Sequence, residues 1–185
     1  MMFNYLELLE RVLPVPQKAY NTGNEELWSK FEKEVGIVFP NDYKKLIGRY
    51  GTGGIGNFIW FLTPFSADRN VNYLERMNIM LEAYQISKSK LPEYFIHNVY
   101  PDKGGLLPWG YTDNGDELYW KTDECLDNWE IIIYESASPD YCCYKMSLAE
   151  FLYKIITGKL VCDIFPNNLF NGEAAYIAVE TKGWI

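Results

Sequence analysis

Apolar residues recur every three or four positions in five stretches of the chain, which is the spacing of amphipathic helices. The longest of these stretches carries apolar residues at Leu74, Met77, Leu81 and Tyr84. Two stretches begin with the spacing of a capping box, Thr22 with Glu25 and Ser147 with Glu150. The pattern predicts helices over residues 4–13, 22–36, 40–50, 71–91 and 147–158.

Other segments have apolar residues that alternate, or run on, over the length of a strand. The longest such segment reads LLPWGYTDNGDELYWKTD, two alternating runs around an Asp-Asn-Gly-Asp turn, and this is typical of a β-hairpin. Further strand candidates are NFIWFLTPF, WEIIIYES, YCCYKM and the late segment AAYIAVE. Strands that follow one another through hairpins predict an α+β fold, with an antiparallel meander of about four to six strands and helices packed on one side. We place Trp109, Tyr111, Leu118 and Trp120 on the face that meets the helices, although alternation alone leaves the face open.

The stretch GRYGTGGIGNFIWF raises the question of a nucleotide site, because Gly51, Gly53 and Gly56 match G-x-G-x-x-G. A dinucleotide fingerprint needs the order strand, glycine turn, helix, so that the helix N-terminus faces the phosphates. Here the glycines follow a predicted helix and precede a predicted strand. We therefore expect them to end a helix and to let backbones pass closely, without binding phosphate.

The composition is that of one globular domain, or of one domain with an appended tail: 185 residues, 48% of them hydrophobic and 17% aromatic. The sequence predicts no membrane span, and its first residues, with several glutamates, do not resemble a secretory signal, so we expect a cytoplasmic protein. We expect the four cysteines to be reduced, since they have no C-x-x-C spacing. His97 is the sole histidine, which removes most zinc sites and histidine-based triads, and we expect it to be a hydrogen-bonded loop residue.

The net negative charge of the chain limits the kinds of macromolecule that it can bind. The formal net charge is −8, which argues against binding nucleic acid through phosphates and favours a basic partner. Residues 113–130 contain seven carboxylates and one lysine, a net charge of −6. Acidic residues are therefore concentrated around the predicted hairpin.

Two segments together resemble a known family. They are LWSKFEKEVGIVFPNDYKKLIGRYGTGG, a helix followed by an L-P-x-D-Y-type helix start and a glycine-rich turn, and the hairpin LLPWGYTDNGDELYWKTD. Their order and spacing resemble the SUKH superfamily, in its Smi/Knr branch. Asp42, Tyr43, Gly53, Gly54, Gly115 and Asp116 match its motif positions. Phe39 departs from the leucine that usually precedes the proline.

The resemblance implies a division of the chain and a function. Residues 1–24 would be an N-terminal helix and linker, 25–160 the SUKH-like domain, and 161–185 an extension packed on it. The family implies a non-enzymatic α+β binding domain, and we expect no cofactor and no metal. Its bacterial members resemble immunity proteins that neutralise polymorphic toxins, and its fungal members resemble regulators of cell-wall glucan synthesis.

We expect the hairpin region to bind the partner, a basic toxin domain of the nuclease type, by occluding its active site. Acidic side chains raise association rates with a basic groove, and aromatic side chains anchor interfaces. The expected contact residues are Asp113, Asp116, Glu117, Asp123, Glu124, Asp127, Trp109 and Trp120. Three alternatives remain open: a solvated acidic face over an aromatic core, a regulatory scaffold, and a carbohydrate-active or carbohydrate-binding protein. The last has a geometric difficulty, because Asp116 and Glu117 are neighbours and would point to opposite faces of a strand.

Overall fold

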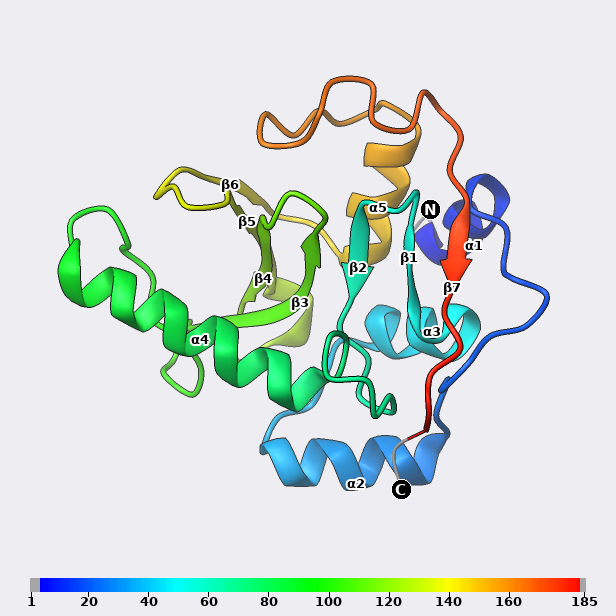
Figure 1. Cartoon of the computed structure of the whole chain (residues 1–185), viewed down its shortest axis with the longest axis horizontal. Helices are drawn as coiled ribbons and strands as arrows, with labels where there is room; N and C mark the ends of the chain where they lie inside the picture. Colours follow the sequence, from blue (N-terminus) through cyan, green and yellow to red (C-terminus); the bar gives the residue numbers. More distant parts are fainter. Residues whose placement is uncertain (1–3, 184–185) are drawn as a thin grey trace.

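The computed structural model describes residues 4–183 and confirms the predicted α+β fold class (Figure 1). The helices are α1 (Tyr5–Val12), α2 (Glu25–Val35), α3 (Asn41–Tyr50), α4 (Tyr73–Lys90) and α5 (Leu148–Ile156), with a short 3₁₀ helix, η1, at Leu126–Asn128. The strands are β1 (Gly53–Ile55), β2 (Ile59–Phe61), β3 (Leu106–Thr112), β4 (Glu117–Lys121), β5 (Glu130–Tyr134), β6 (Tyr141–Tyr144) and β7 (Tyr176–Ala178). No helix within residues 4–183 combines the length and the apolar character needed to cross a membrane.

All seven strands described form one antiparallel sheet in the order β6-β5-β4-β3-β2-β1-β7. The sequence predicted about four to six strands. The difference arises at the β7 edge, where the glycine-rich region forms two short strands in a hairpin, β1 and β2. The late segment AAYIAVE supplies β7, which pairs with β1. The chain therefore closes its meander with a strand that lies more than 120 residues after its partner, as the register of Gly53 with Ala178 shows.

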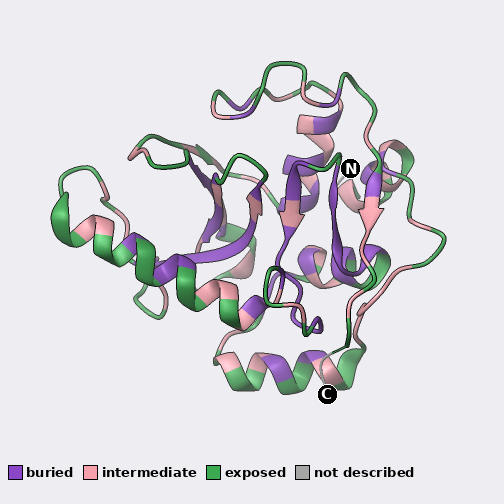
Figure 2. Ribbon diagram, viewed as in Figure 1, coloured by how far each residue is buried: buried purple, intermediate pink, exposed green. Residues whose placement is uncertain are grey.

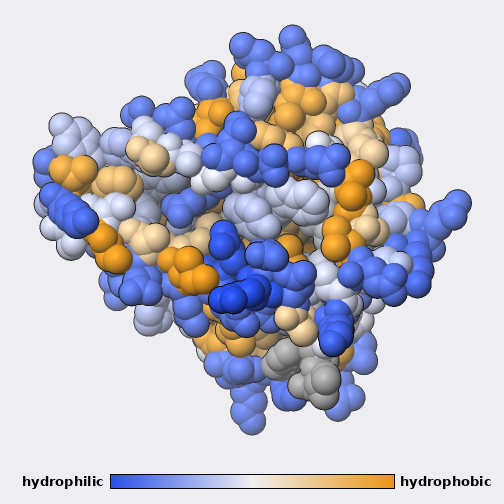
Figure 3. Space-filling view, viewed as in Figure 1, coloured by the Kyte–Doolittle hydropathy of each residue, from blue (hydrophilic) through white to orange (hydrophobic). Residues whose placement is uncertain are grey.

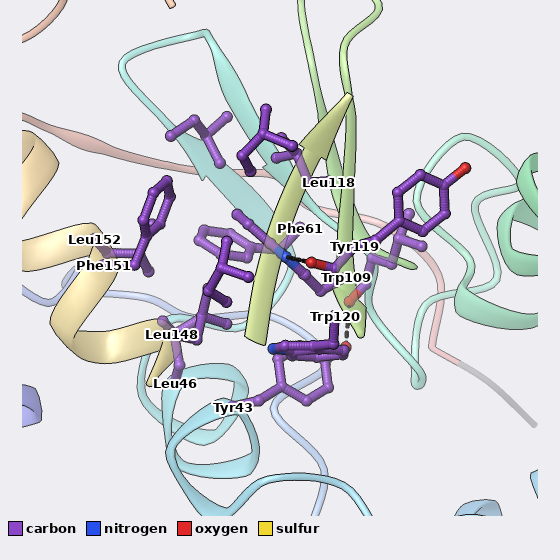
Figure 4. Close-up of a cluster of buried hydrophobic side chains, with 14 of the residues drawn as sticks. Tyr43, Leu46, Phe61, Trp109, Leu118, Tyr119, Trp120, Leu148, Phe151 and Leu152 are labelled. Atoms are coloured by element: carbon purple, nitrogen blue, oxygen red, sulfur yellow. Dashed lines mark hydrogen bonds between the residues drawn. The ribbon is translucent and has the colours of Figure 1, made fainter. Parts of the chain in front are cut away.

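Helices cover both faces of the sheet, not one as the pattern predicted. On one face the buried Tyr119 of β4 donates a hydrogen bond of 3.4 Å to the Met80 carbonyl of α4, which crosses in front of β3 and β4 in Figure 1. Its neighbour Trp120 points to the opposite face and meets Tyr43 of α3, with ring centroids 5.0 Å apart. Figure 4 shows Trp109 and Trp120 among side chains from α3 and α5. Alternation along β4 thus serves two helical layers.

A β-bulge explains why the four residues that we placed on one face of the sheet do not all share it. The register between β3 and β4 shifts between Pro108 and Gly110, so Trp109 is an extra residue in β3. Beyond the shift, Tyr111 pairs with Glu117 and lies under Arg76 of α4, 4.9 Å from the guanidinium carbon to the ring centroid. Tyr111 therefore lies on the face opposite to Trp120.

The glycine-rich stretch ends a helix and enters a strand, in the order that the sequence predicted. Gly51 is the C-cap of α3, with φ 67° and ψ −151°, a conformation that is almost restricted to glycine. The backbone of Tyr20 lies where a Cβ at this position would be. The geometry at Gly51 is explained by helix termination and close packing.

Two predicted helix starts have different outcomes. Ser147 is the N-cap of α5, and its hydroxyl accepts a 3.3 Å hydrogen bond from the Glu150 N–H, as the capping-box spacing predicted. At α2 the prediction was wrong: Asn24, not Thr22, is the N-cap, and its side chain accepts from the Leu27 N–H at 2.9 Å. Asn ranks at least as high as Thr as an N-cap, so local propensity favours the observed start.

Candidate protein-binding surface

The two tryptophans predicted to anchor a partner are in the hydrophobic core. Trp109 is 0% exposed and Trp120 is 1% exposed, and Figure 2 shows the central strands as buried. The Trp109 indole N–H donates to the Tyr119 carbonyl at 3.1 Å, so its polar atom is satisfied inside the fold. These side chains stabilise the sheet between α3 and α5 and are not surface anchors. The same burial removes the aromatic platform on which a carbohydrate-binding alternative depended.

Asp116 is also buried, which corrects its assignment as a contact residue. Its Oδ2 accepts a 2.6 Å hydrogen bond from the Thr112 hydroxyl, and its Oδ1 accepts a 3.0 Å bond from the Ser136 N–H. The side chain is 2% exposed. Asp116 therefore joins the β3–β4 turn to the segment that follows β5. Both of its carboxylate oxygens accept hydrogen bonds, as a buried polar group requires.

The remaining predicted carboxylates do not form one patch, because β4 separates them. Asp113 lies in the turn that precedes β4 and Glu117 is the first residue of β4, whereas Asp123, Glu124 and Asp127 lie in the loop that follows it. A five-residue strand spans roughly 15 Å at about 3.3 Å per residue, which exceeds a Debye length in physiological salt. The acidic concentration seen in the sequence is thus divided between opposite ends of a strand.

At the loop end, lysines offset much of the negative charge. Lys103 lies 2.7 Å from Glu124, and both Lys121 and Lys145 contact Glu130, at 3.2 and 3.4 Å. Asp123 is occupied by hydrogen bonds from the Cys125 N–H and the Asn128 amide, which lower its pKa. Asp123, Glu124 and Asp127 are exposed, but their surroundings are mixed in charge.

At the turn end, the carboxylates keep their charge unpaired. Asp113, Glu135 and Asp140 are exposed, and Glu117 is partly buried. Within residues 4–183 no lysine or arginine nitrogen comes within 4.0 Å of any of these four carboxylates. The sequence did not single out Glu135 or Asp140, because both come after β5 and outside the acidic run.

Two of these carboxylates, Glu117 and Glu135, line a cleft of about 410 Å³, which we call the acidic cleft; Asp113 and Asp140 lie close in sequence to its lining residues Gly115 and Pro139. One wall is the C-terminal half of α4 and the segment after it, and the other is formed by the β3–β4 turn and the β5–β6 connection. The lining residues are Ala83, Tyr84, Ser87, Lys90, Leu91, Phe95, Gly115, Glu117, Tyr134, Glu135, Ser136, Ala137, Ser138 and Pro139. Its volume lies in the range of natural ligand pockets, about 300–1,000 Å³.

Glu117 is the one carboxylate that combines burial with access to this cleft. Its Oε2 accepts a 2.9 Å hydrogen bond from the Tyr119 hydroxyl, two positions along the same face of β4. Burial raises the pKa of Glu117, and the hydrogen bond from Tyr119 and the charge of Arg76 oppose that rise. No donor within residues 4–183 hydrogen-bonds to its Oε1, and this oxygen is not enclosed by the protein, so it can accept a hydrogen bond from a group that enters the cleft.

A network of tyrosines fixes the wall of the cleft. The hydroxyls of Tyr84 and Tyr134 lie 3.0 Å apart, and the His97 Nδ1 lies 2.7 Å from the Tyr134 hydroxyl. The His97 backbone N–H also donates to the Tyr84 hydroxyl at 3.1 Å. The prediction that His97 is a hydrogen-bonded loop residue is confirmed. Burial, with the charges of Lys121 and Lys88, lowers its pKa.

Exposed apolar side chains flank the acidic cleft on its α4 side. Leu91 is 45% exposed, Tyr94 is 55% exposed and Ile96 is 56% exposed, all in the segment that follows α4. Ile79 and Ile86 add exposed apolar groups on α4 itself, and Figure 3 shows orange patches along the position of this helix. Apolar groups beside a charged rim are the arrangement found at protein–protein interfaces.

The described residues offer no metal centre and no disulfide. No group of three or more His, Cys, Asp or Glu side chains within residues 4–183 is arranged to hold a metal ion. All four cysteines, Cys125, Cys142, Cys143 and Cys162, are free thiols.

Comparison with known proteins bears directly on this architecture. The family model SUKH_6, described as SMI1-KNR4 cell-wall, matches residues 25–152, which is 128 of the 185 residues and includes β1 to β6. No curated protein and no solved structure matches the chain significantly. The matched region contains every element that lines the acidic cleft. On this match, which covers more than half of its length, the chain belongs to the SUKH superfamily, in its SMI1-KNR4 branch.

Proposed function

We propose that this protein is an immunity-type binding protein that captures a basic toxin domain at the acidic cleft. The observation that carries the proposal is the set of unpaired carboxylates at the turn end, Asp113, Glu117, Glu135 and Asp140. Glu117 and Glu135 line the cleft, and exposed apolar side chains lie beside it. A nuclease toxin presents a basic groove for nucleic acid, and a surface of opposite potential attracts it and blocks the groove. The proposed interface moves from the whole hairpin to its turn end.

Two further observations support this proposal. The SUKH family is generally non-enzymatic, and its members often act through protein–protein interaction with toxins. The net charge of −8 favours a basic partner. Lysines partly neutralise the carboxylates at the loop end, whereas the carboxylates at the turn end form no ion pairs with lysine or arginine in the part of the chain that the structure describes. The charge and the family together support a basic toxin as the partner and the blocking of its active site as the mode of action.

The test uses two triple variants that change the charge by the same amount at the two ends of β4. The first is Asp113→Asn, Glu135→Gln and Asp140→Asn, and the control is Asp123→Asn, Glu124→Gln and Asp127→Asn; all six positions are exposed. Association with the toxin-like domain encoded beside this gene is measured from low to high salt. The first variant should slow association about tenfold at low salt and flatten the salt dependence, and the control should change it by less than about twofold. The reverse order of effects would place the interface at the loop end and overturn the proposal.

A second function is favoured by the description of the matching family, which names the cell wall. On that alternative the same surface would hold an endogenous partner, as a regulatory scaffold of the cell-wall glucan-synthesis type. Gene context separates the two functions. A secreted protein with a toxin-like C-terminal domain encoded next to this gene supports immunity, and a neighbourhood of wall-synthesis genes without a toxin supports the scaffold.

A further inference from the structure

We propose that the acidic cleft is a receptor for a single arginine side chain of the protein partner, with the Glu117 carboxylate as its counterion. This inference rests on the proposed function, because it assigns the partner group that enters the same site. It names one position, Glu117, and one chemical group, a guanidinium.

The first step is the geometry of the carboxylate. Glu117 opens β4 and lines the cleft, and the Tyr119 hydroxyl holds its Oε2 at 2.9 Å. This bond orients the carboxyl group and leaves Oε1 without a donor from residues 4–183. Glu117 is partly buried, and a carboxylate in such a setting forms a stronger charge-assisted hydrogen bond with an incoming N–H donor than a fully exposed carboxylate does.

The second step is the chemistry of the walls. The Phe95 and Tyr134 rings stack at 14°, with centroids 6.0 Å apart, and both line the cleft. A guanidinium stacks on aromatic faces and presents several N–H groups in one plane, whereas an ammonium is a compact, strongly hydrated charge. Ala83 and Leu91 line the mouth on the α4 side and offer apolar contact to the methylene stem of an arginine.

The apolar surface beside the cleft indicates that the arginine belongs to a protein. Leu91, Tyr94 and Ile96 leave apolar surface exposed beside the mouth, which a free amino acid does not cover. A folded partner that inserts one side chain also buries this surface, and buried arginines with an apolar surround are typical hot spots. An anion is disfavoured because the cleft is lined by two carboxylates, Glu117 and Glu135, and by one lysine, Lys90.

Binding should depend on pH through Glu117. The groups that face or flank it are Arg76, Tyr84 and Lys90 of α4, Tyr111 of β3, Tyr119 of β4, and Tyr134 and Glu135 at the end of β5. The Arg76 guanidinium carbon lies 4.9 Å from the Tyr111 ring centroid; Arg76 makes no ion pair with Glu117 within 4.0 Å, although its positive charge opposes the rise in the pKa of Glu117 that burial causes. The ionised carboxylate binds a cation and the protonated form does not. Since burial raises the pKa of Glu117, affinity should fall as the pH drops through that raised value.

The experiment follows amide shifts of the ¹⁵N-labelled full chain during titration with N-acetyl-arginine methylamide. The lysine and citrulline analogues are the matched probes. We expect saturable shifts at Gly115, Glu117 and Ser136 for the arginine probe, and at least about tenfold weaker binding of the other two probes. Glu117→Gln should weaken binding of the arginine probe at least about tenfold, since it removes one partner of a desolvated charge pair. The control Glu124→Gln, at the loop end, should leave it unchanged.

Equal binding of arginine, lysine and citrulline probes, or wild-type affinity in a folded Glu117→Gln variant, would overturn the inference. A separate readout distinguishes it from the proposed function. If the toxin domain binds wild type and Glu117→Gln equally well, the arginine receptor is wrong and the binding function stands. If the arginine probe binds but the toxin domain does not, the receptor stands and the immunity proposal fails.

Discussion

Thr112 and Asp116 close the β3–β4 turn by reciprocal hydrogen bonds. The Thr112 hydroxyl donates to Asp116 Oδ2 at 2.6 Å, the Asp116 N–H donates to Thr112 Oγ1 at 3.0 Å, and the Thr112 N–H donates to the Asp116 carbonyl at 3.0 Å. The other carboxylate oxygen of Asp116, Oδ1, accepts a hydrogen bond from the Ser136 N–H. The pair thereby positions both the turn and the β5–β6 connection, which are one wall of the acidic cleft.

Replacing Asp116 by alanine should lower the free energy of unfolding by about 2–3 kcal/mol, because it leaves the buried Thr112 hydroxyl and the Ser136 N–H without their acceptor. Urea unfolding at neutral pH measures the change. Asp113→Ala, three residues earlier in the same turn but exposed, is the control and should stay within about 0.5 kcal/mol of wild type. Equal effects of the two substitutions would mean that the hydrogen bonds of Asp116 do not stabilise the turn.

Two glycines of the glycine-rich region should respond to alanine with opposite signs. Gly51→Ala should destabilise the protein by about 1–3 kcal/mol, because Gly51 has φ 67° and its Cβ would meet the Tyr20 backbone. Gly48→Ala should stabilise it by about 0.5–1 kcal/mol, since Gly48 lies within α3 with open space around its Cα. Thermal unfolding of both variants checks the prediction. A nucleotide-dependent rise in the melting temperature of wild type would contradict our explanation of these glycines.

Glu117 should make stability depend on pH in a defined direction. Burial raises its pKa in the folded state above the ordinary value of 4.5, so the folded state binds this proton more tightly than the unfolded state. The stabilisation from this group is therefore fully present below pH 4.5 and is lost as the pH rises through the raised pKa. Glu117→Gln keeps an acceptor for the Tyr119 hydroxyl and removes the charge.

The variant should accordingly be at least as stable as wild type at neutral pH, and the difference between the two should shrink on acidification. Chemical unfolding from pH 4 to pH 8 measures both curves. A constant difference across this range would show that Glu117 ionises with the same pKa in the folded and unfolded states. Retention of a destabilising buried acid is what a binding role for Glu117 leads one to expect.

The helices were predictable because each has an apolar stripe that buries locally. In α5, for example, Phe151, Leu152 and Ile156 carry the period in the sequence and are all buried. The β3–β4 hairpin was predictable from its Asp-Asn-Gly-Asp turn. The face on which each β3 side chain lies could not be predicted. The bulge at Trp109 moves every later residue of the strand to the other face, and the alternation before the bulge gives no sign of this one-residue shift.

The candidate site was predicted only in part, for a reason of geometry. Proximity in sequence placed Asp113 and Asp127 in one acidic run, but a strand carries the chain away from the turn, and they lie beyond opposite ends of β4. The neighbours that complete the acidic cleft come from elsewhere: Phe95 after α4 and Glu135 after β5. No local pattern joins these segments, because the sheet order and the path of α4 bring them together.

The tail tests whether the chain is one folding unit. Its β7 pairs with β1 although the family match ends at residue 152. Tyr176 of β7 is buried, packs on Tyr50 with centroids 4.9 Å apart, and donates a 2.7 Å hydrogen bond to the Gly51 carbonyl. Tyr176→Ala should destabilise the protein by about 3–5 kcal/mol, as large aromatic truncations in a core do, and Tyr176→Phe by about 1 kcal/mol for the lost hydrogen bond.

Binding should not follow these changes in stability. The acidic cleft lies beside β5 and β6, at the sheet edge opposite to β7, and adjacent strands are about 4.8 Å apart, so the two edges are separated by well over 20 Å. Tyr176→Phe should therefore unfold at lower denaturant concentration and still bind the partner with wild-type affinity, when measured by titration under conditions where both proteins are folded. A loss of affinity in this mild variant would show that the tail belongs to the interface and that the acidic cleft is not the whole of it.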